Sequence, residues 1–362
     1  MRALLRGFGA LILFLLVALC FAPTIIPPFL DRIYYRGAAG DHFDGERFFN
    51  PDGAAPARGR ANFFRRWAGS EERAQWPDRI RVTPTIPPRR VDGADMRVTW
   101  IGHATVLVQT QGLNILTDPI WSDRASPFSF AGPRRVRQPG VRIDGLPKID
   151  LIVVSHNHYD HMDLPTLKRL WERDRPRIVT SLGNDTILAG RNIRSTALDW
   201  GGRAQIRPGI EVIVERNHHW SSRWFTDRNR ALWSAFTIVT PGGNIFFAGD
   251  TGWGDGSWVT EAARRGRFRL AIIPIGAYEP RDFMRTHHIN PEEAVRIFEA
   301  LNPARALGVH WGTFQLTFEP IDEPRQRLAA LRRERGIAPD WFIATEAGQT
   351  FSVPPLDRQI RR

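Results

Sequence analysis

Hydrophobic and polar positions form a regular pattern only after about residue 95 of this chain. From there, short apolar runs separated by turn residues predict strands, and Gln111-Gly112 predicts a hairpin turn. The run 149–154 is apolar without interruption, so we expect a strand buried on both faces. The expected strands cover 97–101, 105–110, 114–116, 149–154, 178–181, 210–214, 235–240, 244–247, 270–274 and 306–309.

Helical periodicity and capping residues predict four helices among these strands. Asp163 is the expected N-cap of the first helix, and Asn290, followed by Glu292 and Glu293, is that of the third. The expected helices cover 164–171, 258–265, 291–301 and 324–335. Meanders followed by strand–helix crossovers predict an α/β (α+β) fold of stacked sheets covered by helices, in one domain over residues 96–362.

The amino terminus carries an apolar run of about one membrane span, Gly7 to Ile26, without charge between Arg6 and Asp31. It predicts a transmembrane anchor or a signal segment over residues 1–30. We favour the anchor because the small-residue cleavage site near Cys20 is loose. Cations before the run favour an inner-membrane location with the body outside the cytoplasm, but cations soon after it leave the orientation open.

Residues 31–95 are rich in Gly, Pro, Arg and aromatic residues, which predicts an extended arm that packs on the body. One short helix is expected near 62–68. The aromatic and basic stretch 63–67 fits either a membrane-interface segment or a packing contact of the arm. His42, within the arm, is expected to face solvent.

Composition narrows the class of protein. Hydrophobic residues make up 42% of the chain, which supports a folded core and argues against global disorder. The single cysteine, Cys20, excludes an intrachain disulfide and a cysteine-based zinc site. A net charge of +12, carried almost entirely by Arg, is compatible with attraction to lipid headgroups or nucleic acid.

The segment directly after the run 149–154 places three imidazoles and a carboxylate within six residues: His156, His158, Asp160 and His161. Four such side chains at the end of a buried strand would carry a large desolvation penalty unless something binds them. Neutral imidazole and carboxylate are ligands that zinc-type ions prefer. The motif therefore predicts a metal site.

Three further candidate ligands follow other expected strands, namely His219, Asp250 and His310. His218 is an alternative to His219. Side chains at equivalent strand ends converge on one edge of a sheet, where ligands are usually gathered. Seven ligands can surround two ions, and two ions about 3.5–4 Å apart support hydrolysis by activating water.

Two other polar residues near the same edge are candidates for orienting the ligands. His103 lies between two expected strands and Asp118 ends another, so either could hydrogen-bond a metal-bound side chain. A purely structural role for His103 is equally compatible with its position. Tyr278, Glu279 and Arg281, in the loop after 270–274, are expected to line the site.

The metal motif with its later ligands resembles that of the metallo-β-lactamase fold superfamily, whose αββα sandwich carries a dinuclear site at one edge. More closely, the chain resembles N-acyl-phosphatidylethanolamine-hydrolysing phospholipase D over roughly residues 96–353. The matching blocks are Thr99–Thr105, Leu116–Ser122, Arg124–Pro127, Gly132–Arg135, Ile275–Arg281, His288–Ala294 and His310–Phe314.

That resemblance implies a ligand set and a substrate contact. His156, His158 and His219 would hold a first zinc, while Asp160, His161 and His310 would hold a second, with Asp250 bridging. The family pattern favours His219 over His218. Asp160 and Asp250 would also relay a proton, and His288 would contact substrate, although it could instead lie beside the cap of the following helix. Iron or manganese would bind the same ligands.

The resulting hypothesis is hydrolysis of a membrane phospholipid at its phosphodiester, with N-acyl-phosphatidylethanolamine giving N-acylethanolamine and phosphatidic acid. The alternative is a hydrolase of the same fold for a lactone, a thioester or another phosphodiester. A membrane and a phospholipid are the expected partners, and a homodimer is also considered. Nucleic acid is disfavoured because no RNA-binding module is present. A membrane-tethered scaffold would not explain seven retained ligands.

Overall fold

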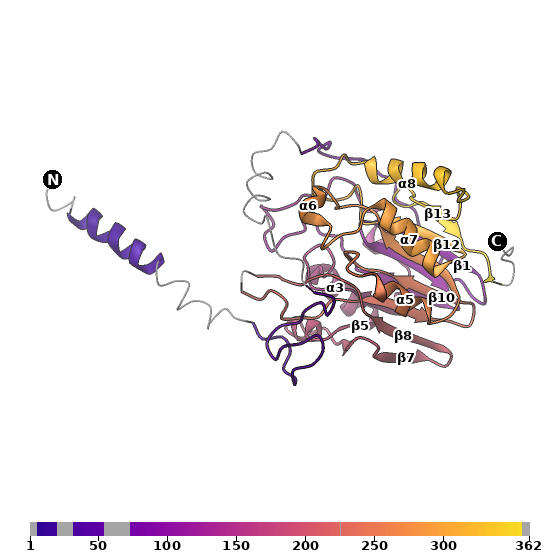
Figure 1. Cartoon of the computed structure of the whole chain (residues 1–362), viewed down its shortest axis with the longest axis horizontal. Helices are drawn as coiled ribbons and strands as arrows, with labels where there is room; N and C mark the ends of the chain where they lie inside the picture. Colours follow the sequence, from indigo (N-terminus) through magenta and orange to yellow (C-terminus); the bar gives the residue numbers. More distant parts are fainter. Residues whose placement is uncertain (1–5, 20–31, 54–72, 225, 357–362) are drawn as a thin grey trace.

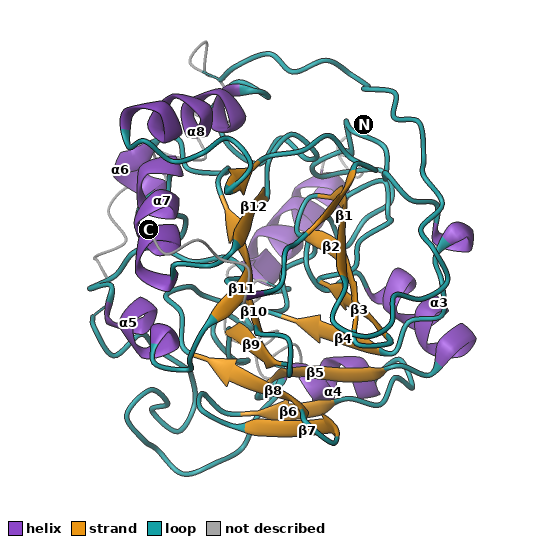
Figure 2. Cartoon of the chain, turned by 90° about the vertical axis from the view of Figure 1, so that its right-hand side faces the viewer, coloured by secondary structure: helices purple, strands orange, loops and turns teal. Residues whose placement is uncertain are grey.

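The computed structural model describes residues 6–19, 32–53, 73–224 and 226–356. Two seven-stranded sheets stack face to face, with helices on both outer sides (Figure 1, Figure 2). This is the expected αββα sandwich. The strands are β1 (Met96–Gly102), β2 (Thr105–Thr110), β3 (Leu113–Thr117), β4 (Leu151–Val154), β5 (Arg177–Ser181), β6 (Thr196–Leu198), β7 (Arg203–Arg207), β8 (Ile210–Glu215), β9 (Ala235–Val239), β10 (Asn244–Phe247), β11 (Phe268–Pro274), β12 (Arg305–Val309), β13 (Phe342–Ile343) and β14 (Thr350–Ser352).

Each sheet combines an antiparallel half with a parallel half. The first sheet has the order β14-β1-β2-β3-β4-β5-β6, and its strands run parallel from β3 to β6. The second has the order β13-β12-β11-β10-β9-β8-β7, with β10 to β13 parallel. The parallel strands end at the same edge of each sheet, so the residues that follow them are brought together.

Burial explains why the central strands form where the apolar runs lie. Every residue of β4, β10 and β11 is buried, as expected for strands covered on both faces. The core between the sheets includes Val153, Phe246 and Ile272, whereas a separate cluster packs Ile152 beneath Leu167. Alternate residues of β4 therefore pack into the core between the sheets and into the cluster on the outer face of the first sheet.

The helices cover the outer faces of the sheets (Figure 2). Apolar residues of α3 and α4 belong to the cluster on the outer face of the first sheet. Those of α5, α7 and α8 join the core of the second sheet. The helices are η1 (Ile143–Gly145), α3 (Leu164–Asp174), α4 (Asn184–Ala189), α5 (Ser257–Ala263), α6 (Arg281–Met284), α7 (Pro291–Leu301) and α8 (Glu323–Glu334).

All ten expected strands and all four expected helices are present, with ends that differ by a few residues. Helix α7 matches its expected bounds, because Asn290 and Glu293 form a capping box. Asp163 stands at the N-cap of α3 without capping it: its carboxylate accepts hydrogen bonds from Ser122 N and Ser122 Oγ at 3.0 and 2.8 Å. The pattern missed only short elements, namely β6, β7, β13, β14, α4, α6 and η1.

The amino-terminal segment is described only in part. Residues 6–19 form a helix, and 1–5 and 20–31 lie outside the described residues. Within the described part of the chain, no helix is both long and apolar enough to cross a bilayer. The anchor or signal segment expected over residues 1–30 stays a prediction. The short helix expected near 62–68 and the stretch 63–67 also lie outside the described residues.

The described parts of the expected arm contact the body at several points. Phe43 and Phe48 form a small apolar cluster with Trp233, and Tyr34 Oη donates to Asp227 Oδ2 at 2.8 Å. His42 does not face solvent as expected. Its ring lies between two carboxylates, with Nε2 at 2.7 Å from Asp199 Oδ1, and its side chain is only 13% exposed. The division into arm and hydrolase domain stays a prediction.

Candidate metal centre

The seven expected ligands meet at one edge of the two sheets. The loop after β4 supplies His156, His158, Asp160 and His161. His219 follows β8, Asp250 follows β10 and His310 follows β12. Residues up to 154 positions apart are thus joined because the ends of parallel strands lie side by side.

The first part of the cluster, which we call the imidazole group, consists of His156, His158 and His219. His158 Nδ1 lies 2.7 Å from His156 Nε2 and 3.4 Å from His219 Nε2. The three ligand atoms all lie within 4.8 Å of one another, the separation expected of atoms that can share one ion. No carboxylate belongs to this group.

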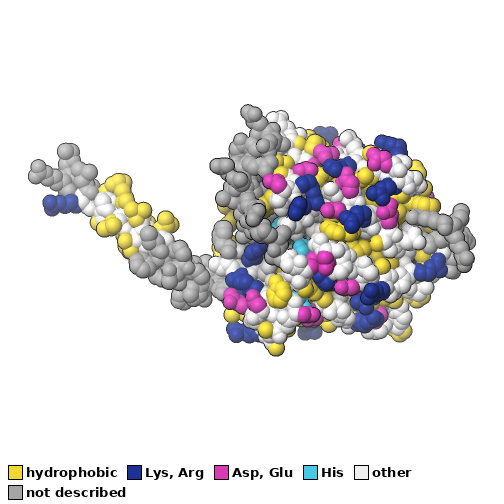
Figure 3. Space-filling view, in the orientation of Figure 1, with side chains coloured by type: hydrophobic (Ala, Val, Ile, Leu, Met, Phe, Trp, Pro, Cys, Tyr) yellow, Lys and Arg dark blue, Asp and Glu magenta, His cyan; other side chains and the backbone are white. Residues whose placement is uncertain are grey.

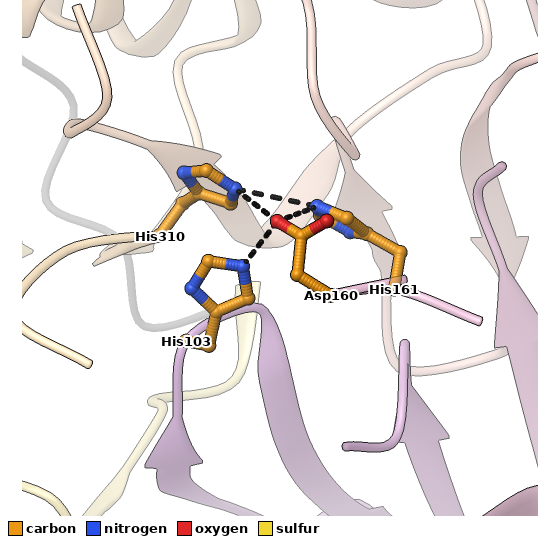
Figure 4. Close-up of side chains that lie close together, drawn as sticks. All are labelled: His103, Asp160, His161 and His310. Atoms are coloured by element: carbon orange, nitrogen blue, oxygen red, sulfur yellow. Dashed lines mark hydrogen bonds and ion pairs between the residues drawn. The ribbon is translucent and has the colours of Figure 1, made fainter. Parts of the chain in front are cut away.

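The second part, the carboxylate group, consists of Asp160, His161, Asp250 and His310. Asp250 Oδ2 lies 3.0 Å from His161 Nε2 and 3.1 Å from His310 Nε2. Asp160 Oδ2 lies 3.2 and 3.4 Å from the same two nitrogens. Figure 4 shows the rings of His103, His161 and His310 directed at the Asp160 carboxylate.

A single buried carboxylate, Asp118, orients ligands in both groups. It accepts hydrogen bonds from His161 Nδ1 at 2.6 Å and from Ser155 Oγ at 2.5 Å. Ser155 Oγ in turn lies 2.9 Å from His156 Nδ1. With Nδ1 committed as a donor, Nε2 of the neutral His156 directs a lone pair at the cluster, and Nε2 of His161 is the nitrogen left to face the Asp160 and Asp250 carboxylates or a bound ion.

Hydrogen bonding around His219 leads to the same result. His219 Nδ1 donates to the carbonyl oxygen of His287 at 2.8 Å, so its Nε2 is also the lone-pair nitrogen. Lone pairs of neighbouring imidazoles that point at one another repel unless a cation or a proton lies between them. Several buried atoms, His158 Nε2, Asp250 Oδ1, His288 Nδ1 and His310 Nδ1, have no hydrogen-bond partner. The donor set therefore fits divalent transition-metal ions.

Electrostatics differ between the two groups. Burial lowers the pKa of His158 to about 3 and holds those of His156 and His219 well below the usual value. Burial would lower the pKa of His310 as well, but Asp250 and Asp160 outweigh it and raise that pKa to about 9. The imidazole group thus offers neutral ligands, whereas charges in the carboxylate group compensate one another.

The structure separates His219 from its neighbour His218. His218 belongs to none of the candidate ligand groups among the described residues, and its Nδ1 lies 2.8 Å from Asp52 Oδ2 in the amino-terminal arm. The geometry therefore favours His219 as the candidate ligand of the pair. His103 also joins the site, because its Nε2 lies 2.8 Å from Asp160 Oδ2.

A cavity of about 530 Å³ reaches the cluster from outside. It is lined in part by His288, whose Nδ1 lies 3.8 Å from Asp250 Oδ2; a substrate contact by His288 stays a prediction. The lining combines cluster residues with aromatic and apolar side chains and with the polar Ser222 and the charged Arg228: Ala125, His158, Tyr159, Asp160, Trp220, Ser222, Trp224, Arg228, Asp250, Phe283, Met284, His287, His288 and Leu316.

Tyr278, Glu279 and Arg281 do not line this cavity, contrary to expectation. Tyr278 is fully buried and donates to Glu323 Oε1 at 2.9 Å, while Arg281 forms an ion pair with Glu293. Trp220 was not among the residues expected at the site; it follows the candidate ligand His219 directly, and its ring centroid lies 4.3 Å from that of His158. Its position beside His219 was the available signal.

The fold and the cluster together define a metallo-hydrolase of the β-lactamase type. Residues 113–311 match the beta-lactamase superfamily domain. The chain is 36% identical over 334 residues to N-acyl-phosphatidylethanolamine-hydrolyzing phospholipase D 1 of Caenorhabditis elegans. The aligned region covers 87% of this chain and 93% of that protein. It is 35% identical over 279 residues to the mitochondrial enzyme of that name from Saccharomyces cerevisiae, covering 75% and 59% of the two chains.

Solved structures share the fold at lower identity. An isothiocyanate hydrolase from Delia radicum gut bacteria has a TM-score of 0.57 and 20% identity, and the match covers 71% of this chain and 100% of that chain. The metallo hydrolase Igni18 of Ignicoccus hospitalis has a TM-score of 0.54 and 20% identity, covering 72% and 99%. The chain belongs to the beta-lactamase superfamily, in the family of the nematode and yeast proteins, and is a metal-dependent hydrolase.

Proposed function

We propose that the protein hydrolyses a membrane phospholipid at a phosphodiester, with N-acyl-phosphatidylethanolamine as the substrate and N-acylethanolamine and phosphatidic acid as products. The observation that carries this proposal is the pair of candidate ligand groups, of which His158, Asp160 and Asp250 line a cavity together with several aromatic and apolar side chains. Extended identity to proteins named for that reaction supports the substrate class. Zinc is the proposed metal, one ion at each group, with iron or manganese as alternatives.

Bound ions would supply activated water and would neutralise charge that develops on the phosphoryl oxygens. The protein residues supply the rest of the chemistry. Asp250 Oδ1 is a buried acceptor without a partner in a carboxylate that lines the cavity, so it can accept a proton from water. His288 lies on the cavity wall, where it can contact the phosphoryl or leaving oxygen.

A substrate panel on the metal-replete protein tests this proposal. We expect release of N-acylethanolamine and phosphatidic acid from N-acyl-phosphatidylethanolamine, abolished by chelation and restored by zinc. Turnover of a plain soluble phosphodiester without turnover of the lipid would overturn the lipid assignment. A lactone and a thioester belong in the same panel, because cleavage of either in place of the lipid would support the alternative hydrolase.

Membrane association is part of this proposal, since the substrate resides in a bilayer. The basic net charge of +12 supports attraction to anionic lipid headgroups. A homodimer and a location outside the cytoplasm stay predictions.

A further inference from the structure

Two phenylalanines stand out on the surface of the hydrolase body. Among the described residues from Met96 onward, Phe128 and Phe130 are the large hydrophobic side chains that are exposed, at 45% and 79%. Their rings lie 5.4 Å apart and so form one apolar tip. Exposed aromatic residues that gather at one place mark interaction sites more often than isolated ones do.

The loop that carries this tip is held in shape by hydrogen bonds. Its two sides are joined by Ala125 N to Pro133 O at 3.0 Å and by Arg135 N to Asp123 O at 2.7 Å. Arg124 Nε also donates to Ser129 O at 3.1 Å, across the loop. We call residues 123–135 the Phe loop.

A buried cation fixes the base of the Phe loop to the body. Arg135 is 3% exposed, donates to Ile120 O at 3.0 Å, and its guanidinium lies 4.7 Å from the Phe314 ring centroid. The two rings of the tip are therefore presented to solvent by an ordered loop, so little ordering entropy is lost when a partner covers them.

The Phe loop also adjoins the cavity. Ala125, three residues before Phe128, lines the same cavity as Asp160 and Asp250. Leu316 and Phe283 extend the apolar lining of that cavity. The loop that carries the phenylalanine tip therefore contributes directly to the lining of the cavity.

We propose that the Phe loop inserts into the interfacial region of a lipid bilayer and thereby sets the cavity mouth against the membrane surface. This inference rests on the proposed function only in that it supplies a route for a lipid substrate. Phenylalanine favours the boundary between headgroups and acyl chains, and the exposed Arg134 of the same loop is suited to anionic headgroups. The combination of an apolar tip and a cation favours a bilayer over a neutral protein partner.

An environment-sensitive fluorophore placed at the tip tests the insertion directly. In a Cys20→Ser background, Phe130→Cys would be labelled with nitrobenzoxadiazole and mixed with phosphatidylcholine vesicles that contain phosphatidylglycerol. We expect a several-fold rise in emission and quenching by doxyl-labelled lipids. The matched control is Ile86→Cys, because Ile86 is 87% exposed but lies outside the Phe loop; its label should stay in water.

The labelling experiment needs no hydrolysis, so its outcome is independent of the proposed activity. A label at position 130 that remains in water while the protein sediments with the vesicles would overturn the insertion. Arg134→Gln should weaken binding to the anionic vesicles roughly fivefold, and less at high salt.

A second experiment measures turnover by the double variant Phe128→Ser/Phe130→Ser. We expect kcat/KM on lipid in vesicles to fall roughly tenfold or more, with kcat/KM on a soluble phosphodiester unchanged. An equal loss on both substrates would contradict the proposal, because a membrane contact should not affect a substrate that arrives from water.

Discussion

Histidines lie beside aspartates both in the cluster of candidate metal ligands and where the amino-terminal arm contacts the body, yet the two regions differ in geometry. In the arm contacts a ring nitrogen faces a carboxylate: His42 lies between Asp41 and Asp199, and His218 Nδ1 pairs with Asp52. In the cluster the nitrogens of different rings face one another, as His158 Nδ1 and His156 Nε2 do at 2.7 Å.

The difference shows that proximity of His and Asp is not enough to identify a metal site. An arm contact is complete as a hydrogen-bonded ion pair, because every donor there has an acceptor. The cluster leaves buried lone pairs without donors, and the resulting free-energy penalty is removed when a cation binds. The following predictions test that distinction in order of decreasing effect.

The largest effect is expected from Asp250→Asn, which removes the carboxylate that contacts both His161 and His310. Hydrolytic activity should fall more than roughly a hundredfold, the upper range seen for residues that merely orient a ligand. Asp199→Asn makes the same chemical change in an arm contact and should alter activity less than about threefold. Comparable losses in kcat for the two variants would remove the distinction between the regions.

Neighbouring histidines offer the next comparison. His219→Ala should lose the metal of the imidazole group, so metal per protein, measured by plasma emission spectrometry, should drop by about half. His218→Ala should keep its metal, because His218 pairs with Asp52 instead. Loss of metal from the His218 variant alone would show that the ligand assignment is wrong.

Asp118→Asn should weaken metal binding about 10–100-fold, because Asp118 orients His161 directly and His156 through Ser155. Competition with a chromophoric chelator would measure this. Asp163→Asn is the control, since the buried Asp163 carboxylate holds Ser122 and contacts no cluster residue in the described structure. Equal weakening by both variants would indicate general destabilisation rather than ligand orientation.

The smallest effect is a pH dependence of the arm contact. The hydrogen bond with Asp199 raises the pKa of His42, although burial opposes this shift. Since the folded-state pKa lies above the ordinary 6.5, the protonated pair stabilises the fold fully below that value, and this contribution is lost as pH rises through the raised pKa. The loss should stay below about 1 kcal/mol because the pair is partly exposed.

Urea unfolding at pH values of about 6 and about 8 would measure this change, and Asp199→Asn should reduce it. An unchanged pH dependence in that variant would show that another group is responsible.

Local sequence determined much of the fold and part of the site. The unbroken apolar run of β4 and the adjacent His156–His161 segment specified a buried strand with ligands at its end, because both signals lie within eleven consecutive residues. The start of α7 followed from Asn290 as its expected N-cap, with Glu292 and Glu293 in the first turn, and the structure completes this as a capping box. Strand ends also indicated Asp250 and His310, since chain order and parallel pairing place those ends together.

Other features depended on contacts between distant parts of the chain. The family pattern favoured His219 over His218, but the hydrogen bonds that separate the two rings come from Asp52 and the His287 carbonyl. The placement of His42 likewise depends on Asp199. Pairing of β14 with β1 spans some 250 residues and leaves no local signal. Tertiary structure decided these points because hydrogen bonds and burial between distant segments have no periodicity or spacing in the sequence that would reveal them.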